Sequence, residues 1–202
     1  MSHMRYLSSL SLVALLLPAL LGNVACKGER SSGKKPDAPK MPSELADLPG
    51  NLWLDVVAGW KRAPLDLNIS AGGKTLGVTI AAPPHYLLES KPSSAILRFA
   101  FKPSSGNSFL PVFNIESVFR PSLDATEAML KGNGHKVMTK EGGQGRYTLV
   151  SETKEGSTIV IAARGEIQCR AILEGSVSAR SIAFARSVCE SLTPRDAASR
   201  AN

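Results

Sequence analysis

Aromatic residues are scarce in this chain, and the short motifs that mark common enzyme classes are missing. Phe, Trp and Tyr make up 5% of the 202 residues, so aliphatic side chains and alanine must fill most of the core. The sequence contains no Gly-x-Ser-x-Gly elbow, no Cys-x-x-Cys pair and no His-x-x-x-His pair. The enzymes and metal proteins that these motifs identify are therefore not indicated.

Neither the histidines nor the glycine-rich stretches indicate catalysis or phosphate binding. His85 and His135 each stand alone in the sequence, and we interpret both as ordinary surface residues. The glycine-rich stretches 132–134 and 142–145 lead into expected strands, not into a helix that opens with Lys-Ser or Lys-Thr. No pair of carboxylates stands out for acid–base catalysis. We therefore predict a protein that is not an enzyme and that holds no metal and no cofactor.

The charge of the chain does not favour a nucleic-acid partner. The formal net charge is +7, but residues 27–40 carry +3 of it and Arg5 one more, which leaves +3 for residues 41–202. A folded part with that charge is ordinary, whereas nucleic-acid-binding domains concentrate Lys and Arg on one face. The positive charge near the N-terminus is placed to face anionic lipid headgroups.

The N-terminus has the pattern of a bacterial export signal. Arg5 precedes an apolar stretch over residues 7–21, and that stretch is shorter than the ~20 residues that span a bilayer. Residues 21–26, Leu-Gly-Asn-Val-Ala-Cys, resemble a lipobox, although Asn23 replaces the usual aliphatic residue. The resemblance implies cleavage before Cys26 and acylation of that cysteine, for instance with palmitate. The alternative is an ordinary secretory signal that is cut nearby.

These features divide the chain into four parts. A signal peptide (1–25) is followed by the acylated cysteine with a flexible basic tether (26–43), a globular domain (44–193) and a disordered tail (194–202). The tether is rich in Lys, Ser, Gly and Pro and has almost no apolar residues. Because Lys27 follows the cysteine instead of Asp, we expect the outer membrane of the bacterial envelope, with the domain in the periplasm.

Three cysteines fit an exported lipoprotein. Acylation of Cys26 leaves an even pair, Cys169 and Cys189, and export places that pair in an oxidising compartment. The alternation over residues 167–173 puts Cys169 on the buried face of a strand, and helical spacing puts Cys189 on the apolar face of a C-terminal helix. Because the two faces should pack together, we predict a disulfide. The alternative is a pair of buried free thiols.

Apolar alternation predicts several strands. Two runs, 65–69 and 76–80, flank the turn residues Gly72 and Gly73 and predict a β-hairpin. A second pair of strands is expected at 95–101 and 109–119. Further strands are expected near 135–140, 146–152, 157–164 and 167–173.

Two helices complete the expected domain. Ser122 can cap a helix that runs to Lys131, and residues 177–192 have helical spacing of apolar side chains. The strand 157–164 is apolar on both faces and should lie at the centre of the sheet. The predicted class is therefore α+β, with an antiparallel sheet flanked by helices in a single domain.

This order of elements resembles the PsbP-like (Mog-type) family of α/β/α sandwiches, which includes many bacterial lipoproteins. The residues that carry the resemblance are Pro83 after the first hairpin, Phe113-Asn114-Ile115, Ser122-Leu123-Asp124 and the stretch 185–192. Many relatives have Pro-x-Gly-Trp where this chain has Pro84-His85-Tyr86. The resemblance implies an α/β/α sandwich over about residues 65–192 and a function that is mostly non-enzymatic on this fold.

Trp53 and Trp60 lie in an apolar segment just after the tether. One interpretation is a helix that covers the sheet. The other is an exposed docking surface for a partner.

The leading functional hypothesis is an envelope lipoprotein that is a non-catalytic binding or accessory module for another envelope protein. The first alternative is a carrier of a small hydrophobic or lipid ligand, held between sheet and helix. The second alternative is an unrecognised hydrolase, whose activity would depend on a single Ser or His.

Overall fold

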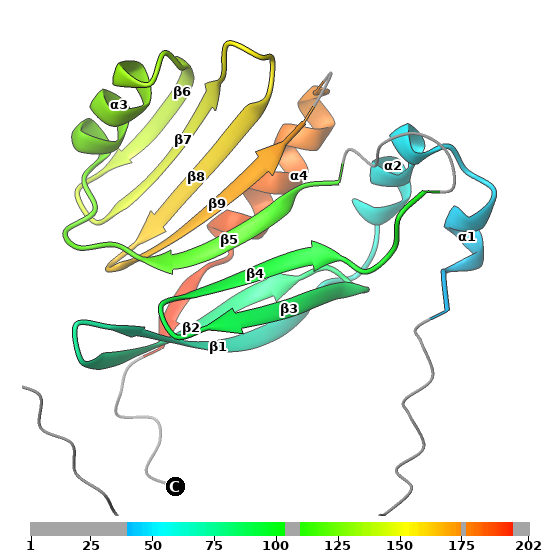
Figure 1. Cartoon of the computed structure of the whole chain (residues 1–202), viewed down its shortest axis with the longest axis horizontal. Coiled ribbons are helices and arrows are strands. Elements are labelled where there is room, and N and C mark those ends of the chain that lie inside the picture. Colours follow the sequence, from blue (N-terminus) through cyan, green and yellow to red (C-terminus); the bar gives the residue numbers. More distant parts are fainter. Residues whose placement is uncertain (1–39, 104–109, 175–176, 196–202) are drawn as a thin grey trace, which may run out of the picture. The chain divides into compact units, whose positions relative to one another are not determined.

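Residues 40–103, 110–174 and 177–195 are described by the computed structural model (Figure 1). They lie within one compact unit that spans residues 39–202. The helical segments are α1 (Ser43–Ala46), the 3-10 helix η1 (Gly50–Leu52), α2 (Trp53–Val57), α3 (Leu123–Gly132) and α4 (Ala179–Glu190). The strands are β1 (Ala63–Ala71), β2 (Lys74–Ala82), β3 (Tyr86–Lys91), β4 (Ser94–Phe99), β5 (Val112–Ser117), β6 (Lys136–Gly143), β7 (Arg146–Glu152), β8 (Thr158–Arg164), β9 (Ile167–Leu173) and β10 (Thr193–Arg195).

Two antiparallel sheets dominate the described part of the chain. The small sheet has the order β1-β2-β10, and the large sheet has the order β3-β4-β5-β9-β8-β7-β6. Strand β1 packs against β4 and β5, so the small sheet covers part of one face of the large sheet (Figure 1). The fold is therefore a mostly-β sandwich, and the predicted α+β class with an α/β/α sandwich is wrong.

The error has a physical cause in the first hairpin and in the N-terminal helix. The hairpin was expected to join a single sheet, but it pairs only with β10 and forms a second layer of strands. The helix that was one interpretation of the segment with Trp53 and Trp60 is only the short pair η1 and α2. Because strands and not long helices fill this layer, the core lies mainly between sheets.

The hairpin β1–β2 forms where the sequence predicts it. Gly72 and Gly73 both have positive φ, 54° and 79°, which is the conformation of a two-residue turn between strands. Ala71 pairs with Lys74 directly across this turn. The alternate residues Leu67, Ile69, Val78 and Ile80 are buried and form the inner face of the small sheet.

Strand β8 lies inside the large sheet and is covered on both faces, as its apolar sequence predicts. Val160 and Ala162 belong to the main core, whereas Ile161 and Ala163 belong to a second cluster that includes Leu130 of α3. Successive side chains of a strand point to opposite faces. Helices α3 and α4 therefore lie on opposite faces of the large sheet.

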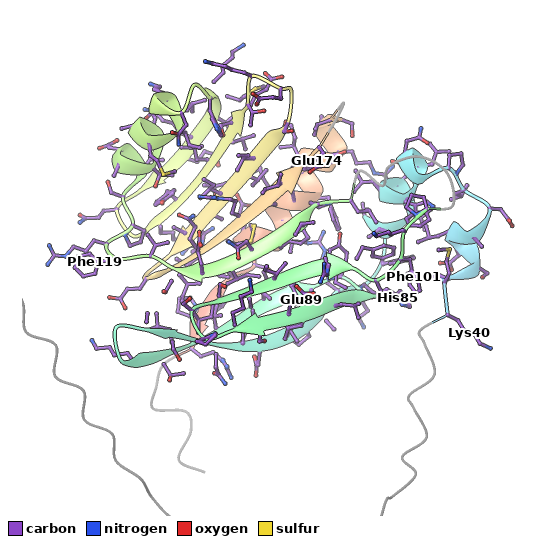
Figure 2. The ribbon with its side chains drawn as sticks, in the orientation of Figure 1. Lys40, His85, Glu89, Phe101, Phe119 and Glu174 are labelled. Atoms are coloured by element: carbon purple, nitrogen blue, oxygen red, sulfur yellow. A yellow bond between two sulfur atoms is a disulfide. The ribbon has the colours of Figure 1, made fainter. Side chains whose placement is uncertain are left out.

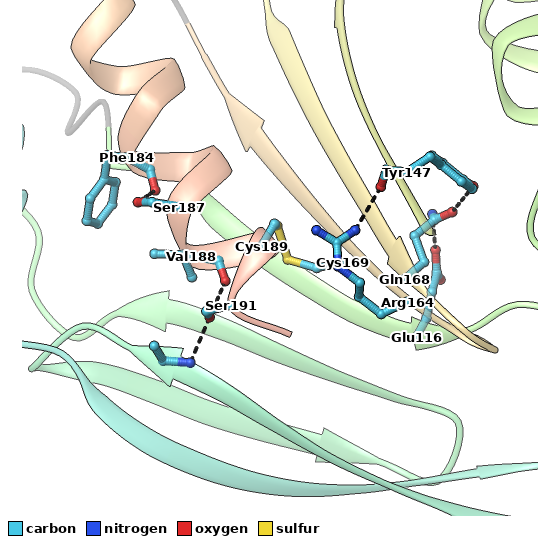
Figure 3. Close-up of a disulfide and its surroundings, with 11 residues drawn as sticks. Glu116, Tyr147, Arg164, Gln168, Cys169, Phe184, Ser187, Val188, Cys189 and Ser191 are labelled. Carbon is cyan, nitrogen blue, oxygen red and sulfur yellow. Dashed lines mark hydrogen bonds between the residues drawn. A yellow bond between two sulfur atoms is a disulfide. The ribbon is translucent and has the colours of Figure 1, made fainter. Parts of the chain in front are cut away.

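The predicted disulfide joins the large sheet to α4. Cys169 of β9 and Cys189 of α4 are bonded, with their Cα atoms 5.3 Å apart, and both are fully buried (Figure 3). Ser191, just after α4, accepts a hydrogen bond from the backbone N–H of Ala81 in β2 at 2.9 Å. The end of α4 is therefore held by both sheets.

Strand structure extends further than predicted at the C-terminus. The tail was expected from Pro194, but Thr193–Arg195 form β10 against β2. The Arg195 side chain donates to Asp66 Oδ2 at 3.0 Å and to the carbonyl oxygen of Leu67 at 3.0 Å. The remainder of the predicted tail, 196–202, lies outside the described residues, as do Cys26 and the segment 1–39.

Candidate functional site

Trp53 is part of the core and not of a docking surface. Its side chain is 1% exposed. The indole N–H donates to the carbonyl oxygens of Leu45 at 3.1 Å and Leu48 at 3.0 Å, and the ring packs edge-on against Phe99. The prediction that Trp53 contacts a partner is therefore wrong, because α1 and α2 fold around this ring and satisfy its one polar group.

Trp60 lies in a partly exposed aromatic cluster. Its ring centroid is 5.4 Å from that of His85 and 6.2 Å from that of Phe99, and His85 also contacts Phe101 at 5.8 Å. His85 is exposed and has a φ of 60°, an unusual conformation for a residue with a side chain. Contact of Trp60 with a partner stays a prediction, since half-buried rings serve a core as well as an interface.

A hollow formed by the described residues lies at one end of the sandwich, and we call it the end pocket. Its volume is about 530 Å³, which is within the range of small-ligand sites. The tip of the β1–β2 hairpin, the β3–β4 turn, the end of β5 and the β8–β9 turn all contribute to its wall. The residues that line the end pocket include Ser70, Lys74, Ser93, Ser117, Val118, Phe119 and Glu166.

Backbone hydrogen bonds between these turns build the pocket. The N–H of Ser70 donates to the carbonyl oxygen of Pro92 at 2.6 Å, which ties the hairpin to the β3–β4 turn. The N–H of Val118 donates to the carbonyl oxygen of Glu166 at 2.8 Å, which ties the end of β5 to the β8–β9 turn. A third hydrogen bond, from the N–H of Ser117 to the carbonyl oxygen of Ser93 at 3.5 Å, joins these two pairs of segments to each other. The pocket wall is therefore part of the fold and needs no ligand to assemble.

Phe119 is the most unusual residue of the end pocket. Its side chain is 83% exposed, the largest exposure among the large hydrophobic residues that are described. The guanidinium of Arg120 lies over its ring, 5.1 Å from the centroid. Arg120 itself has a φ of 49°. Figure 2 shows Phe119 projecting at the end of the molecule opposite His85 and Phe101.

Two opposite charges line the end pocket without pairing. Lys74 and Glu166 both border it, and among the described residues neither side chain forms a salt bridge or a hydrogen bond with another. A second hollow of about 200 Å³, which includes Gly77 and Ile167, also borders on Glu166. Glu166 therefore lies between two hollows and faces solvent.

The hydrolase alternative requires a serine or a histidine that a substrate can reach. The closest Ser–His approach that forms a hydrogen bond joins Ser151 Oγ to His135 Nδ1 at 3.5 Å, but Ser151 is 0% exposed and no substrate reaches its hydroxyl. The serines of the end pocket have no hydrogen bond to a histidine within the described part of the chain. No group of three or more His, Cys, Asp or Glu side chains there is arranged to hold a metal ion.

A polar network lies on the face of the large sheet that α3 covers. The Tyr147 hydroxyl donates to Gln168 Oε1 at 3.5 Å, and Gln168 donates to Glu116 Oε1 at 3.4 Å (Figure 3). Burial raises the pKa of the Tyr147 hydroxyl, while a hydrogen bond with Thr126 opposes that rise. The phenol therefore stays protonated at neutral pH, and the network is structural.

Comparison with known proteins found no protein-family model that matches the chain and no curated protein that matches its sequence. Among the described residues, no helix has both the length and the apolar character needed to cross a bilayer. The class that fold and site define is a β-sandwich with an open pocket at one end.

Proposed function

We propose that the chain is a lipoprotein of the bacterial envelope, anchored through Cys26 in the outer membrane, whose β-sandwich is a non-catalytic binding module for another envelope protein. The observation that carries the proposal is Phe119. An aromatic ring that is 83% exposed beside a hollow, with an arginine stacked on it, has the composition of an interface hot spot. The tether of residues 27–43 gives the module its reach from the membrane.

The free energy that would be gained by burying the exposed ring of Phe119 favours binding of a partner there. Full burial of a phenylalanine side chain contributes about 2–3 kcal/mol relative to its exposed state. In the free protein this stabilisation is absent, because the ring contacts chiefly Arg120. A partner that covers the ring gains this stabilisation.

The carrier hypothesis has less support in its original form. It placed a hydrophobic ligand between sheet and helix, but the inner side of α4 is filled by Phe184, Ala185, Val188 and Cys189, all buried. The hollow beside α4 measures about 260 Å³ and is lined by Arg62 and Arg180 as well as by Phe184. This open, basic surface lacks the enclosed apolar wall that a lipid chain requires.

Site-specific photo-crosslinking in living cells tests the binding module. A photoreactive phenylalanine analogue replaces Phe119 in one strain and Met138, which is also exposed, in a control strain. We expect one defined envelope protein to be crosslinked from position 119 and not from position 138. Failure to capture a specific protein from 119, or equal capture from both positions, contradicts the proposal.

The anchor is tested separately by mass spectrometry of the protein extracted from its own membranes. We expect a mature chain that begins at acylated Cys26 and is two hydrogens lighter than its reduced form, because of the Cys169–Cys189 disulfide. Cys26→Ser should abolish the lipid mass and release the protein from the membrane fraction. A wild-type chain that retains residues before Cys26, or that carries no lipid, rejects the anchor.

A further inference from the structure

The end pocket separates two charges that the rest of the fold does not neutralise. Several acidic and basic side chains elsewhere on the surface pair, as Arg195 does with Asp66 and Arg180 with Asp55, each at 3.0 Å. Lys74 and Glu166 line the same hollow, yet their charged atoms form no salt bridge with each other. A molecule within the hollow that carries one charge of each sign can meet both.

The remaining wall of the pocket is both apolar and hydroxylated. Val118 and Phe119 supply the apolar part, and Ser70, Ser93 and Ser117 supply hydroxyl groups that donate and accept hydrogen bonds. Each peptide group carries one N–H donor and one C=O acceptor close together, and the serine hydroxyls can bond to both. A ligand with amide groups and an apolar side chain therefore matches each chemical type that lines the hollow.

We infer that the end pocket binds a short peptide with free ends, with its carboxylate near Lys74, its ammonium near Glu166 and an apolar side chain against Phe119 and Val118. The inference goes beyond the proposed protein partner, because it assigns a small ligand to the hollow beside Phe119. The volume of about 530 Å³ accommodates a molecule of a few residues but not a folded domain. A simple anion leaves Glu166 unmatched, and a simple lipid chain leaves both charges unmatched.

The pocket is open to solvent, so the two charge contacts are weakened by water. An exposed ion pair contributes about 0.2–1 kcal/mol. Removal of either ligand charge is therefore expected to weaken binding by up to about fivefold. Burial of Phe119 against the apolar side chain adds to the affinity, and Phe119→Ala should weaken binding at least as much as loss of one charge.

Calorimetric titration of the full-length mature protein in detergent tests the inference, with the tripeptide Leu-Ser-Leu as the probe. Three further probes carry an N-acetyl group, a C-terminal amide, or both. We expect the free peptide to bind and each blocked end to weaken binding. The pairing of charges then predicts a crossed pattern: Glu166→Gln removes the effect of N-acetylation, and Lys74→Met removes the effect of C-amidation.

Matched controls keep the test specific. Glu174→Gln and Lys136→Met remove the same charges from exposed positions outside the pocket and should leave all four affinities unchanged. Thermal unfolding checks that every variant is folded, and Lys74→Gln serves as a second variant at that position. Absence of binding at millimolar peptide, or equal binding of free and doubly blocked peptide, overturns the inference. Crosslinking of a protein partner from position 119 would still stand in that case, so the two failures are distinguishable.

Discussion

At the scale of single residues, the β6–β7 hairpin contains a glycine at a position where a side chain would clash with the main chain. Gly142 has a φ of 94°, and a Cβ atom added to it would lie 2.3 Å from the carbonyl oxygen of Arg146. The neighbouring Gly143 has nothing within 4 Å of such an atom. Two adjacent glycines of one hairpin therefore have opposite tolerance for a side chain.

We expect Gly142→Ala to lower the free energy of unfolding by about 3 kcal/mol, because a left-handed backbone strain adds to a clash with main-chain atoms. Gly143→Ala should change the free energy by less than about 0.5 kcal/mol. Urea denaturation followed by circular dichroism measures both. Equal effects of the two substitutions would show that the hairpin adopts another turn.

Glu141, beside that glycine, has a pKa that depends on α4. Two hydrogen bonds from Arg186, at 3.1 Å and 2.9 Å, and the charge of that guanidinium lower the pKa of the carboxyl below its ordinary value of 4.5. Since the folded pKa is the lower one, the stabilisation is fully present above pH 4.5 and is lost as the pH falls through the folded value. The contact therefore holds the hairpin to the helix at neutral pH and releases it in acid.

Replacement of the guanidinium isolates this effect. We expect Arg186→Met to raise the pKa of Glu141 to the ordinary range, as measured by carbon-detected NMR titration of the carboxyl group. Lys136→Met on the same hairpin should leave the titration of Glu141 as it is. A titration of Glu141 that is unchanged in Arg186→Met would mean that the two side chains do not pair in solution.

At the scale of elements, local signals predicted more than long-range ones. The hairpin at Gly72, the covered strand β8 and the disulfide between β9 and α4 all follow from turn chemistry, periodicity and cysteine parity. What the sequence does not encode locally is the partner of each strand. The prediction therefore placed the first hairpin in the same sheet as the other strands. It assigned β10 to the tail, because three residues are too few to show a periodic pattern.

The end pocket was missed for the same reason. Residues 109–119 were predicted as one strand, with Phe119 on the same face as Phe113 and Ile115. In the structure, β5 ends at Ser117, so Phe119 lies beyond the sheet and is exposed. The polar residue at position 117 breaks the apolar alternation, and Pro121 follows closely. These signals mark a strand end, but only the assembled turns make it a pocket.

The disulfide connects two elements that hydrogen bonds alone do not join. It closes a loop with a sequence separation of 20 residues. In the chain-entropy model, a loop of this length contributes about 3 kcal/mol through its constraint on the unfolded chain. The double substitution Cys169→Ala and Cys189→Ala should therefore lower the free energy of unfolding by about that amount, or more where the buried sulfur atoms leave space.

Chemical reduction provides the control for that prediction. Dithiothreitol should lower the unfolding midpoint of the wild-type protein in denaturant towards that of the double variant and leave the double variant unchanged. A wild-type midpoint that is insensitive to the reductant, once loss of the disulfide has been verified by mass, would mean that packing of α4 on the sheet suffices.

At the scale of the whole molecule, the end pocket and the start of the folded unit lie far apart. Figure 2 shows Phe119 at one end of the molecule and Lys40, where the described chain begins, at the other. If the proposed anchor precedes Lys40, the tether joins the domain at the end that does not carry the pocket. The proposed partner then meets the module on its side away from the tether.

Shortening of the tether tests this arrangement. If residues 27–39 behave as the expected flexible tether, they span about 20 Å on average, and deletion of residues 28–38 shortens that reach by about 12 Å. Lys27 is retained, and the folded domain is untouched. We expect lipidation and thermal stability to be preserved while crosslinking from position 119 falls several-fold, because the partner lies beyond the shortened reach. An equal-length replacement by Gly and Ser should restore the crosslink, since length and not sequence sets the reach. Crosslinking that survives the deletion would place the partner close to the anchoring membrane instead.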